Sequence, residues 1–162
     1  MAAQQRFRSV ARSVLGLLRG AASGGAAAPR RRRSAAPDVA YRPRADGAPD
    51  PGEIVWAWVP YDEGDGRGKD RPVLVIGRRG TDLLGLMLSS QDHDHDAADE
   101  ARYGRIWTDL GTGAWDSRGR PSEVRLDRLL QLPPGDVRRE GAALDRSRFD
   151  RVVAEARGVQ GW

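Results

Sequence analysis

The sequence predicts a mainly β domain, a small antiparallel barrel closed by one C-terminal helix, behind a disordered basic tail. Short runs of β-branched and aromatic residues alternate with turns rich in Gly, Pro and Asp, as in all-β domains. The last apolar segment has helical spacing. Residues 19–52 consist mostly of Ala, Gly, Pro and Arg, which cannot bury enough surface to offset the entropy of ordering a chain. We therefore expect a tail over 1–50 and one domain over 51–162.

The tail carries the basic charge of the chain. Its 50 residues hold 10 arginines against three aspartates, a net charge of +7, whereas residues 51–162 hold 17 basic and 20 acidic residues, a net charge of −3. Residues 4–18 predict a short basic amphipathic helix, which would also suit a transit peptide or an anionic membrane surface. The run Arg30–Arg33 predicts a solvated coil, with phosphate contact as the alternative.

The composition excludes several classes of protein. Without cysteine there is no disulfide framework, thiolate nucleophile or cysteine zinc site, and a reducing cytoplasm is the expected location. No apolar stretch approaches the roughly 20 residues of a membrane span. A single lysine, Lys69, among many arginines indicates a bacterial coding bias. The sequence has no Walker-type phosphate loop, no G-x-S-x-G elbow and no His-Glu-x-x-His helix.

The first half of the domain predicts a curled antiparallel meander. A first strand over 53–59 follows a Pro-Gly pair, and a polar loop over 60–70 follows the strand. The continuous apolar run 72–76 predicts a strand buried on both faces. A short turn then leads to a third strand over 83–88.

The second half predicts shorter strands and the closing helix. A long loop covers residues 89–102. Strands are expected over 103–110, 122–126 and 129–132. Asp145 is a plausible N-cap for a helix over 146–157, whose apolar face comprises Phe149, Val152, Val153 and Ala156.

Two loops carry candidate chemistry, and the first ends at Arg71. Pro72 biases Arg71 to an extended backbone, so its guanidinium lies at the start of a rigid strand. The planar fork of arginine suits a phosphate, because it donates two charge-assisted hydrogen bonds. The equal alternative is a salt bridge to Asp70, Asp62 or Glu63.

The second loop begins where an apolar strand gives way to Ser89, Ser90 and Gln91. These groups can hydrogen-bond a phosphate or a base edge, although capping of the loop's own backbone is the commoner use of such residues. His93 and His95 alternate with aspartates. That pattern suggests a metal site, but a solvated acidic turn is favoured, and we expect no metal or other cofactor.

Four tryptophans are candidates for base stacking, namely Trp56, Trp58, Trp107 and Trp115. Trp56 and Trp58 share one face of the first strand, where packing in a core or dimer is favoured. Trp115 lies in the turn Gly111–Asp116 and is the better candidate for an exposed platform.

The order of these motifs resembles the PemK/MazF family of toxin endoribonucleases. The resemblance covers residues 51–157 and depends most on the opening Gly-Glu-Ile-Val-Trp and on the run Arg-Pro-Val-Leu-Val-Ile. It rests on four segments, Pro51–Trp56, Asp70–Ile76, Leu88–Gln91 and Ser122–Leu129.

The resemblance implies an SH3-like barrel that forms a homodimer and cuts single-stranded RNA without a metal. In such enzymes the ribose 2'-hydroxyl attacks the phosphate, leaving a 2',3'-cyclic phosphate and a 5'-hydroxyl. Members are the toxins of toxin-antitoxin pairs. A protein antitoxin neutralises them, and the complex commonly binds operator DNA to repress its own operon.

The family's catalytic positions map onto Arg71 and Ser89, the latter usually Thr in relatives, with Ser90 as the adjacent alternative. Some relatives carry a Glu five residues before the arginine as a possible general base, but Gly66 stands there in this chain. The substitutes are Asp62, Glu63, Asp65, His93 and His95. Because the domain is acidic overall, a basic RNA groove must be local. Its candidate residues are Arg67, Lys69, Arg71, Arg78 and Arg79, with Gln91 and Trp115 as further RNA contacts.

A non-catalytic binding module is the rival interpretation. Related barrels poison gyrase through protein contacts or act as DNA-binding autoregulators together with their antitoxin. The gyrase poisons rely on C-terminal aromatic residues and lack the arginine-proline pair. Trp162 fits the rival class, whereas Arg71-Pro72 and Ser89 favour the nuclease.

Overall fold

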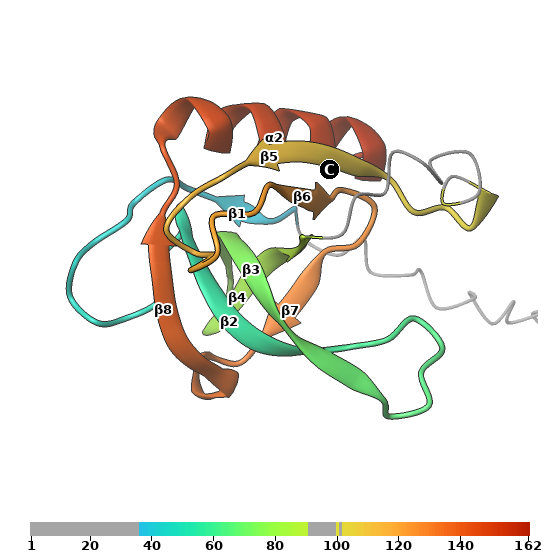
Figure 1. Cartoon of the computed structure of the whole chain (residues 1–162), viewed down its shortest axis with the longest axis horizontal. Helices are drawn as coiled ribbons and strands as arrows, with labels where there is room; N and C mark the ends of the chain where they lie inside the picture. Colours follow the sequence, from blue (N-terminus) through green and yellow to red (C-terminus); the bar gives the residue numbers. More distant parts are fainter. Residues whose placement is uncertain (1–35, 91–99, 101) are drawn as a thin grey trace, which may run out of the picture. The chain divides into compact units, whose positions relative to one another are not determined.

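Three consecutive strands form the centre of the fold. The structure is a computed structural model that describes residues 36–90, 100 and 102–162. Strand β2 (Glu53–Pro60) pairs with β3 (Gly68–Arg79), and β3 pairs with β4 (Asp82–Ser89), both antiparallel (Figure 1). The predicted meander is therefore confirmed. Strand β3 is longer at both ends than the apolar run 72–76, so Arg71 lies within a strand.

The remaining strands extend this meander into a curled sheet. Within the described residues the sheet has eight strands, and its main path follows the order β5-β6-β4-β3-β2-β8. Strands β1 and β7 pair with β3 and β4, respectively. The added strands are β1 (Asp38–Val39), β5 (Trp107–Gly111), β6 (Ser122–Arg125), β7 (Leu130–Leu132) and β8 (Val137–Ala143). A 3-10 turn, η2 (Pro134–Asp136), leads into β8. The observed fold is the mainly antiparallel β fold that the sequence predicts.

The central strands bury side chains on both faces, which explains their continuous apolar runs. One cluster includes Leu74, Ile76 and Leu86 and packs against the helix. On the other face a second cluster includes Val73, Val75 and Met87. A single apolar layer would have left the alternate residues of β3 and β4 in water.

Helix α2 (Arg146–Gln160) covers one side of the sheet (Figure 1). Its N-cap is Asp145, whose carboxylate accepts a hydrogen bond from the backbone N–H of Arg148 at 3.0 Å. The four residues of the predicted apolar face are all buried: Phe149, Val152, Val153 and Ala156. The prediction of this helix is confirmed, although the helix continues three residues beyond 157.

Residues 36–50, expected to belong to the disordered tail, pack on the sheet instead. Strand β1 pairs with β3 at Asp38↔Arg78. The Tyr41 hydroxyl donates to the carbonyl of Leu144 at 2.8 Å, and the Tyr41 ring meets Phe149 edge-on. Tyr41 and Val39 supply apolar contacts in a segment whose composition otherwise indicates disorder. The rest of the tail, including the predicted helix over 4–18 and the run Arg30–Arg33, lies outside the described residues.

Two further differences concern the second half of the domain. The strand expected over 103–110 begins only at Trp107, because the backbone N–H groups of Tyr103 and Arg105 both donate to the carbonyl of Glu100 and form a turn. Strand β8 has no counterpart in the predicted elements.

No helix among the described residues is long and apolar enough to cross a membrane.

The pairing of β1 with β3 depends on a close approach at Gly77. A Cβ atom at this position would collide with the carbonyl oxygen of Asp38 and lie 2.9 Å from its carbon. We expect Gly77→Ala to lower the free energy of unfolding by about 1–3 kcal/mol, because a backbone must shift to make room. Gly135→Ala is the matched control, since a Cβ there meets nothing within 4 Å. Urea unfolding measures both, and equal stability of the two variants would contradict this packing.

Candidate functional site

The site forms where β3 and β4 separate. The two strands pair as far as Val73↔Met87, and β4 then turns to pair with β6 at Leu88↔Val124 and Ser89↔Glu123. On the other side of the gap, Arg71 pairs only with Ala57 of β2. Arg71 and Ser89 are therefore the facing residues just beyond the last rung that joins the two strands.

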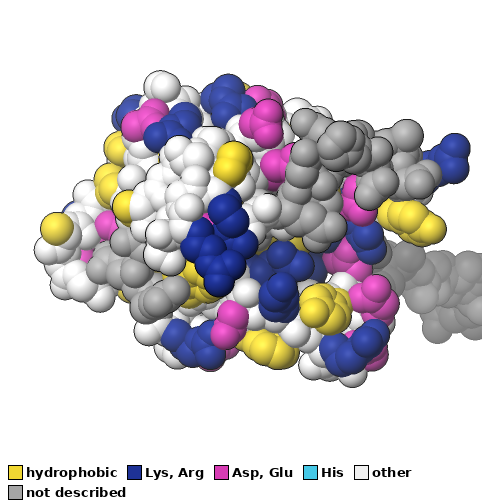
Figure 2. All heavy atoms as spheres, viewed as in Figure 1, with side chains coloured by type: hydrophobic (Ala, Val, Ile, Leu, Met, Phe, Trp, Pro, Cys, Tyr) yellow, Lys and Arg dark blue, Asp and Glu magenta, His cyan; other side chains and the backbone are white. Residues whose placement is uncertain are grey.

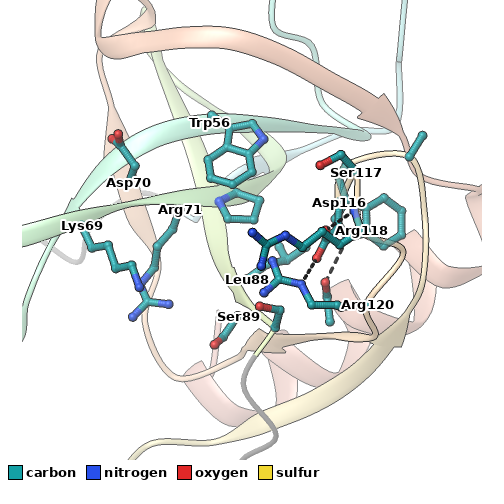
Figure 3. A pocket seen from close by; sticks show the side chains of 15 residues that line it. Trp56, Lys69, Asp70, Arg71, Leu88, Ser89, Asp116, Ser117, Arg118 and Arg120 are labelled. Carbon is teal, nitrogen blue, oxygen red and sulfur yellow. Dashed lines mark hydrogen bonds and ion pairs between the residues drawn. The ribbon is translucent and has the colours of Figure 1, made fainter.

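A cavity of about 530 Å³ opens at this gap, and we call it the Arg71 cavity. Lys69 and Arg71 project from β3 in one direction, whereas Asp70 projects in the other (Figure 3). Four predicted site residues besides Arg71 line the same cavity, namely Lys69, Ser89, Ser90 and Trp115. The remaining lining includes Trp56 and the turn residues Asp116, Ser117, Arg118 and Arg120. The structure thus brings both expected catalytic positions to one opening.

The guanidinium of Arg71 is not neutralised by the acids that the sequence offered as partners. Asp70 forms an ion pair with Arg138, and Asp62 is held by other arginines. No described residue forms an ion pair with Arg71, which is half-buried. Ser89 is 5% exposed, whereas Ser90 is exposed. The arrangement leaves a cation beside a buried hydroxyl, which is suited to an anion such as a phosphodiester.

The opposite wall of the Arg71 cavity is the turn between β5 and β6. Asp116 of this turn accepts hydrogen bonds from the backbone N–H of Arg118 at 2.8 Å and from Nε of Arg120 at 2.9 Å (Figure 3). The hydrogen bond from Arg118 and the contacts of Arg120 outweigh burial and hold the pKa of Asp116 below its usual range. Asp116 is therefore a poor proton acceptor near neutral pH.

The prediction that Trp115 is an exposed stacking platform is wrong. The side chain is 5% exposed, and its indole N–H donates to the Ser122 hydroxyl at 3.0 Å. Arg148 of α2 covers the ring, with its guanidinium carbon 5.6 Å from the ring centre. The turn folds inward because burying the large indole ring gains free energy, whereas the small residues around it gain little from either burial or exposure.

None of the predicted acids of the β2–β3 loop lines the Arg71 cavity, although Glu63 shares a second cavity with Arg71. Asp65 forms an ion pair with Arg67 at 2.6 Å, and neither residue lines the Arg71 cavity. Glu63 lines a second cavity of about 430 Å³, which also includes Arg67 and Arg71. Gln91, His93 and His95 lie outside the described residues.

The basic residues that the sequence predicted as one RNA groove do not all lie together in the structure. Arg78 donates to the carbonyl of Pro49 and approaches Asp50, and Arg79 donates to Gln131, both at the far end of β3 from Arg71. They do not belong to the Arg71 cavity. Figure 2 nevertheless shows Lys and Arg side chains gathered near the middle of the face viewed in Figure 1.

An ion-pair cluster around Asp62 ties the β2–β3 loop to the rest of the domain. The carboxylate of Asp62 lies 2.8 Å from Arg125, 2.9 Å from Arg128 and 3.4 Å from Arg105. Arg125 is 7% exposed and also binds Asp127 through two nitrogens. Burial acts to raise the pKa of Asp62, but the hydrogen bond and charge of Arg125, with Arg128 and Arg105, lower it overall. Asp62 therefore holds the loop and is not poised as a base.

Sequence reasoning missed Arg118 and Arg120 as parts of the site and favoured a packing role for Trp56. Two arginines around a glycine in a turn were visible in the sequence, but nothing local indicated that this turn faces Arg71. Trp56 was assigned to packing, yet it is half-buried and lines the Arg71 cavity. Among the residues with described positions, no group of three His, Asp or Glu side chains is placed to hold a metal.

Comparison with known proteins identifies one family. Residues 50–159 match the family model described as PemK-like, MazF-like toxin of type II toxin-antitoxin system. No curated protein sequence matches the chain.

Two similar solved structures are the toxin MazF-mt6 of Mycobacterium tuberculosis and the MazE-MazF crystal structure from Deinococcus radiodurans. The first is 19% identical and covers 68% of this chain and 99% of its own, with a TM-score of 0.44. The second is 22% identical and covers 72% and 95%, also with a TM-score of 0.44.

Replacing Asp62 by asparagine tests the cluster that holds the β2–β3 loop. The charge faced by three arginines is removed, so we expect the free energy of unfolding at neutral pH to fall by about 1–2 kcal/mol. This is less than for a fully buried pair, because 34% of the Asp62 side chain is exposed. Asp65→Asn, in an exposed pair on the same loop, should change stability by less than about 0.5 kcal/mol.

The difference in the free energy of unfolding between wild type and Asp62→Asn should depend on pH, because the pKa of Asp62 is lowered in the folded protein. The stabilisation is present above the unfolded-state pKa, about 4, and is lost as the pH falls through the lower folded-state value. Urea unfolding of wild type and Asp62→Asn should therefore converge in acid. A stability difference that is unchanged from neutral pH to about pH 2 would contradict the role given to Asp62.

Proposed function

Because the chain belongs to the PemK-like and MazF-like toxins of type II toxin-antitoxin systems, we propose that it is an endoribonuclease that cleaves single-stranded RNA without a metal ion. The observation that carries this proposal is that Arg71 and Ser89 line one cavity, at the point where β3 and β4 separate. The absence of an ion-pair partner for Arg71 in the described part of the chain supports it further.

The proposed reaction is an internal transesterification of RNA. The ribose 2'-oxygen attacks the adjacent phosphorus and forms a new P–O bond, while the bond from phosphorus to the 5'-oxygen breaks. The 2'-hydroxyl loses its proton to a base, and the departing 5'-oxygen gains one. The products are a 2',3'-cyclic phosphate and a 5'-hydroxyl, and no water is consumed.

Arg71 and Ser89 have separate tasks in this reaction. The guanidinium of Arg71 binds the non-bridging oxygens of the phosphate and stabilises the negative charge that develops on them. The hydroxyl of Ser89 hydrogen-bonds the same phosphate or orients the 2'-hydroxyl, which is a positioning effect. Neither carboxylate that lines the Arg71 cavity is assigned as the base, since Asp116 and Asp70 are both paired with arginines. Glu63, which lines the second cavity together with Arg71, stays a candidate for this role.

Membership of a toxin-antitoxin family supports three proposals about assembly. A cognate antitoxin protein binds and neutralises this chain, the toxin acts as a homodimer, and the complex binds operator DNA. We propose the cytoplasm as its location, because the proposed substrate is cellular RNA.

The gyrase-poison alternative gains no support from the C-terminal aromatic residue. Trp162 is partly buried against the helix-side core, its indole N–H donates to Gln160 at 3.0 Å, and Arg157 covers its ring. The ring is engaged within this chain and is not presented for a partner.

Arg71→Ala is the first test of the nuclease. We expect wild type to cleave mixed-sequence single-stranded RNA in excess EDTA and to leave cyclic phosphate ends. The rate should fall about 100- to 1,000-fold in Arg71→Ala, because this variant has no donor aimed at the developing charge. Arg71→Lys should recover only part of the rate, since an ammonium lacks the bidentate fork. Arg42→Ala, an exposed arginine that does not line the cavity, is the control. Cleavage that stops in EDTA, or that is equal in Arg71→Ala and Arg42→Ala, would refute the proposal.

Ser89 and Ser90 form a second, matched pair of variants. Ser89→Ala should slow cleavage by about 10- to 100-fold, the value of one hydrogen bond to a charged group. Ser89→Thr should keep most of the activity because the hydroxyl remains. Ser90→Ala should have little effect on the cleavage rate. Loss of activity in Ser90→Ala together with full activity in Ser89→Ala would show that Ser90, and not Ser89, contacts the phosphate. Single-turnover rates on one RNA distinguish these outcomes.

A further inference from the structure

We propose that Arg118 and Arg120 form a second phosphate subsite, which binds the RNA phosphate next to the one held by Arg71. The inference rests on the proposed nuclease function and extends it to the length of RNA that the site recognises. Both arginines line the Arg71 cavity, on the wall opposite β3 (Figure 3). They come from the β5–β6 turn, residues 112–121, which the catalytic assignment does not use.

The internal hydrogen bonds of this turn orient its arginines toward the cavity. Besides its bonds from Arg118 and Arg120, Asp116 accepts at its carbonyl from the N–H of Gly119 at 2.9 Å. Gly119 has a φ of +64°, which a side chain would disfavour, so the chain reverses tightly between the two arginines. Asp116 thus fixes the backbone of one arginine and the guanidinium of the other.

The base of the turn is anchored in the core. Trp115 is buried beside Asp116 and donates to Ser122. Arg148 of α2 donates to the carbonyls of Leu110 and Thr112, both at 3.1 Å, and covers the Trp115 ring. A turn held in this way loses little conformational entropy when it binds a ligand.

The charge on this wall is positive. Asp116 offsets one of the two arginines, and Arg118 forms no ion pair with any described residue. Nε of Arg120 is occupied by Asp116, while its two terminal nitrogens form no hydrogen bond with any residue that the structure describes. The wall therefore presents donors that match the oxygens of a phosphate.

The cavity has room for more than one phosphate. Its volume of about 530 Å³ lies in the range of roughly 300–1,000 Å³ that encloses drug-sized ligands, so a nucleotide unit fits between the two walls. Successive phosphates of a single strand are separated by one nucleotide. With one phosphate at Arg71, we infer that the arginines of the opposite wall bind the next phosphate along the strand.

The test measures binding of an RNA that cannot be cleaved. A mixed-sequence single strand with 2'-fluoro groups keeps every phosphate and lacks the nucleophile. Its Kd is measured over a range of salt concentrations for full-length wild type, the double variant Arg118→Gln/Arg120→Gln, and the control Arg42→Gln. Circular dichroism checks that each variant is folded.

We expect the double variant to bind about tenfold or more weakly, because two guanidinium groups no longer pair with the RNA backbone. The slope of log affinity against log salt should be smaller by about 0.7 for each phosphate that is no longer neutralised. Arg42→Gln should match wild type. A double variant with wild-type affinity and slope would overturn the subsite. If the double variant unfolds, the Kd and salt slope of the single variant Arg118→Gln test the subsite instead. This variant should stay folded, because Arg118 has no side-chain ion pair within the described residues to lose.

Cleavage of unmodified RNA keeps this result separate from the proposed function. A protein that shows the expected binding pattern and leaves RNA intact retains the subsite and refutes the nuclease. A protein that cleaves RNA in EDTA, with an unchanged salt dependence in the double variant, retains the nuclease and refutes the subsite.

Discussion

The change of partner by β4 is the constraint on which the site depends. As long as β4 pairs with β3, both strands carry apolar residues into two cores. Once β4 turns to β6, the next residues, Arg71 and Ser89, are separated by a gap instead of joined by backbone hydrogen bonds. A register shift between Val75 and Gly77, on the side of β3 away from the gap, increases the local twist of the strand. The same curled sheet therefore supplies both a rigid core and an opening lined by polar side chains.

Ion pairing decides which charges remain for a ligand. Two of the three acids offered as partners of Arg71 are engaged elsewhere, Asp70 with Arg138 and Asp62 with three arginines, and the third, Glu63, forms no ion pair with Arg71. Because of this, a domain with a net charge of −3 over residues 51–162 can still present a positive cavity. Local pairing, and not net charge, determines the sign of the potential where a phosphate would bind.

Elements with strong periodicity could be predicted from sequence, whereas elements formed by tertiary contact could not. The spacing of Phe149, Val152 and Val153 and the cap at Asp145 predicted α2, and the apolar runs predicted β2 to β4. Strand β8 was missed because Val137–Ala143 lacks an apolar alternation and forms by pairing with the edge of β2. Trp115 was misjudged because its neighbours indicate a surface turn, although a distant serine and α2 bury it. Arg71 and Ser89 were candidates from the chemistry of their loops, and the resemblance to a family gave them catalytic roles. Only the structure shows that they share a cavity with Arg118.

The central claim is that Arg71 and Ser89 act on one phosphate, and a double-mutant cycle tests it most directly. Single-turnover cleavage is measured for wild type, Arg71→Lys, Ser89→Ala and the double variant. Groups that act on the same phosphate should show a coupling energy of at least about 0.5 kcal/mol, whereas Arg71→Lys combined with Arg42→Gln should be additive. Independent effects of Arg71→Lys and Ser89→Ala would contradict the claim that they serve one site.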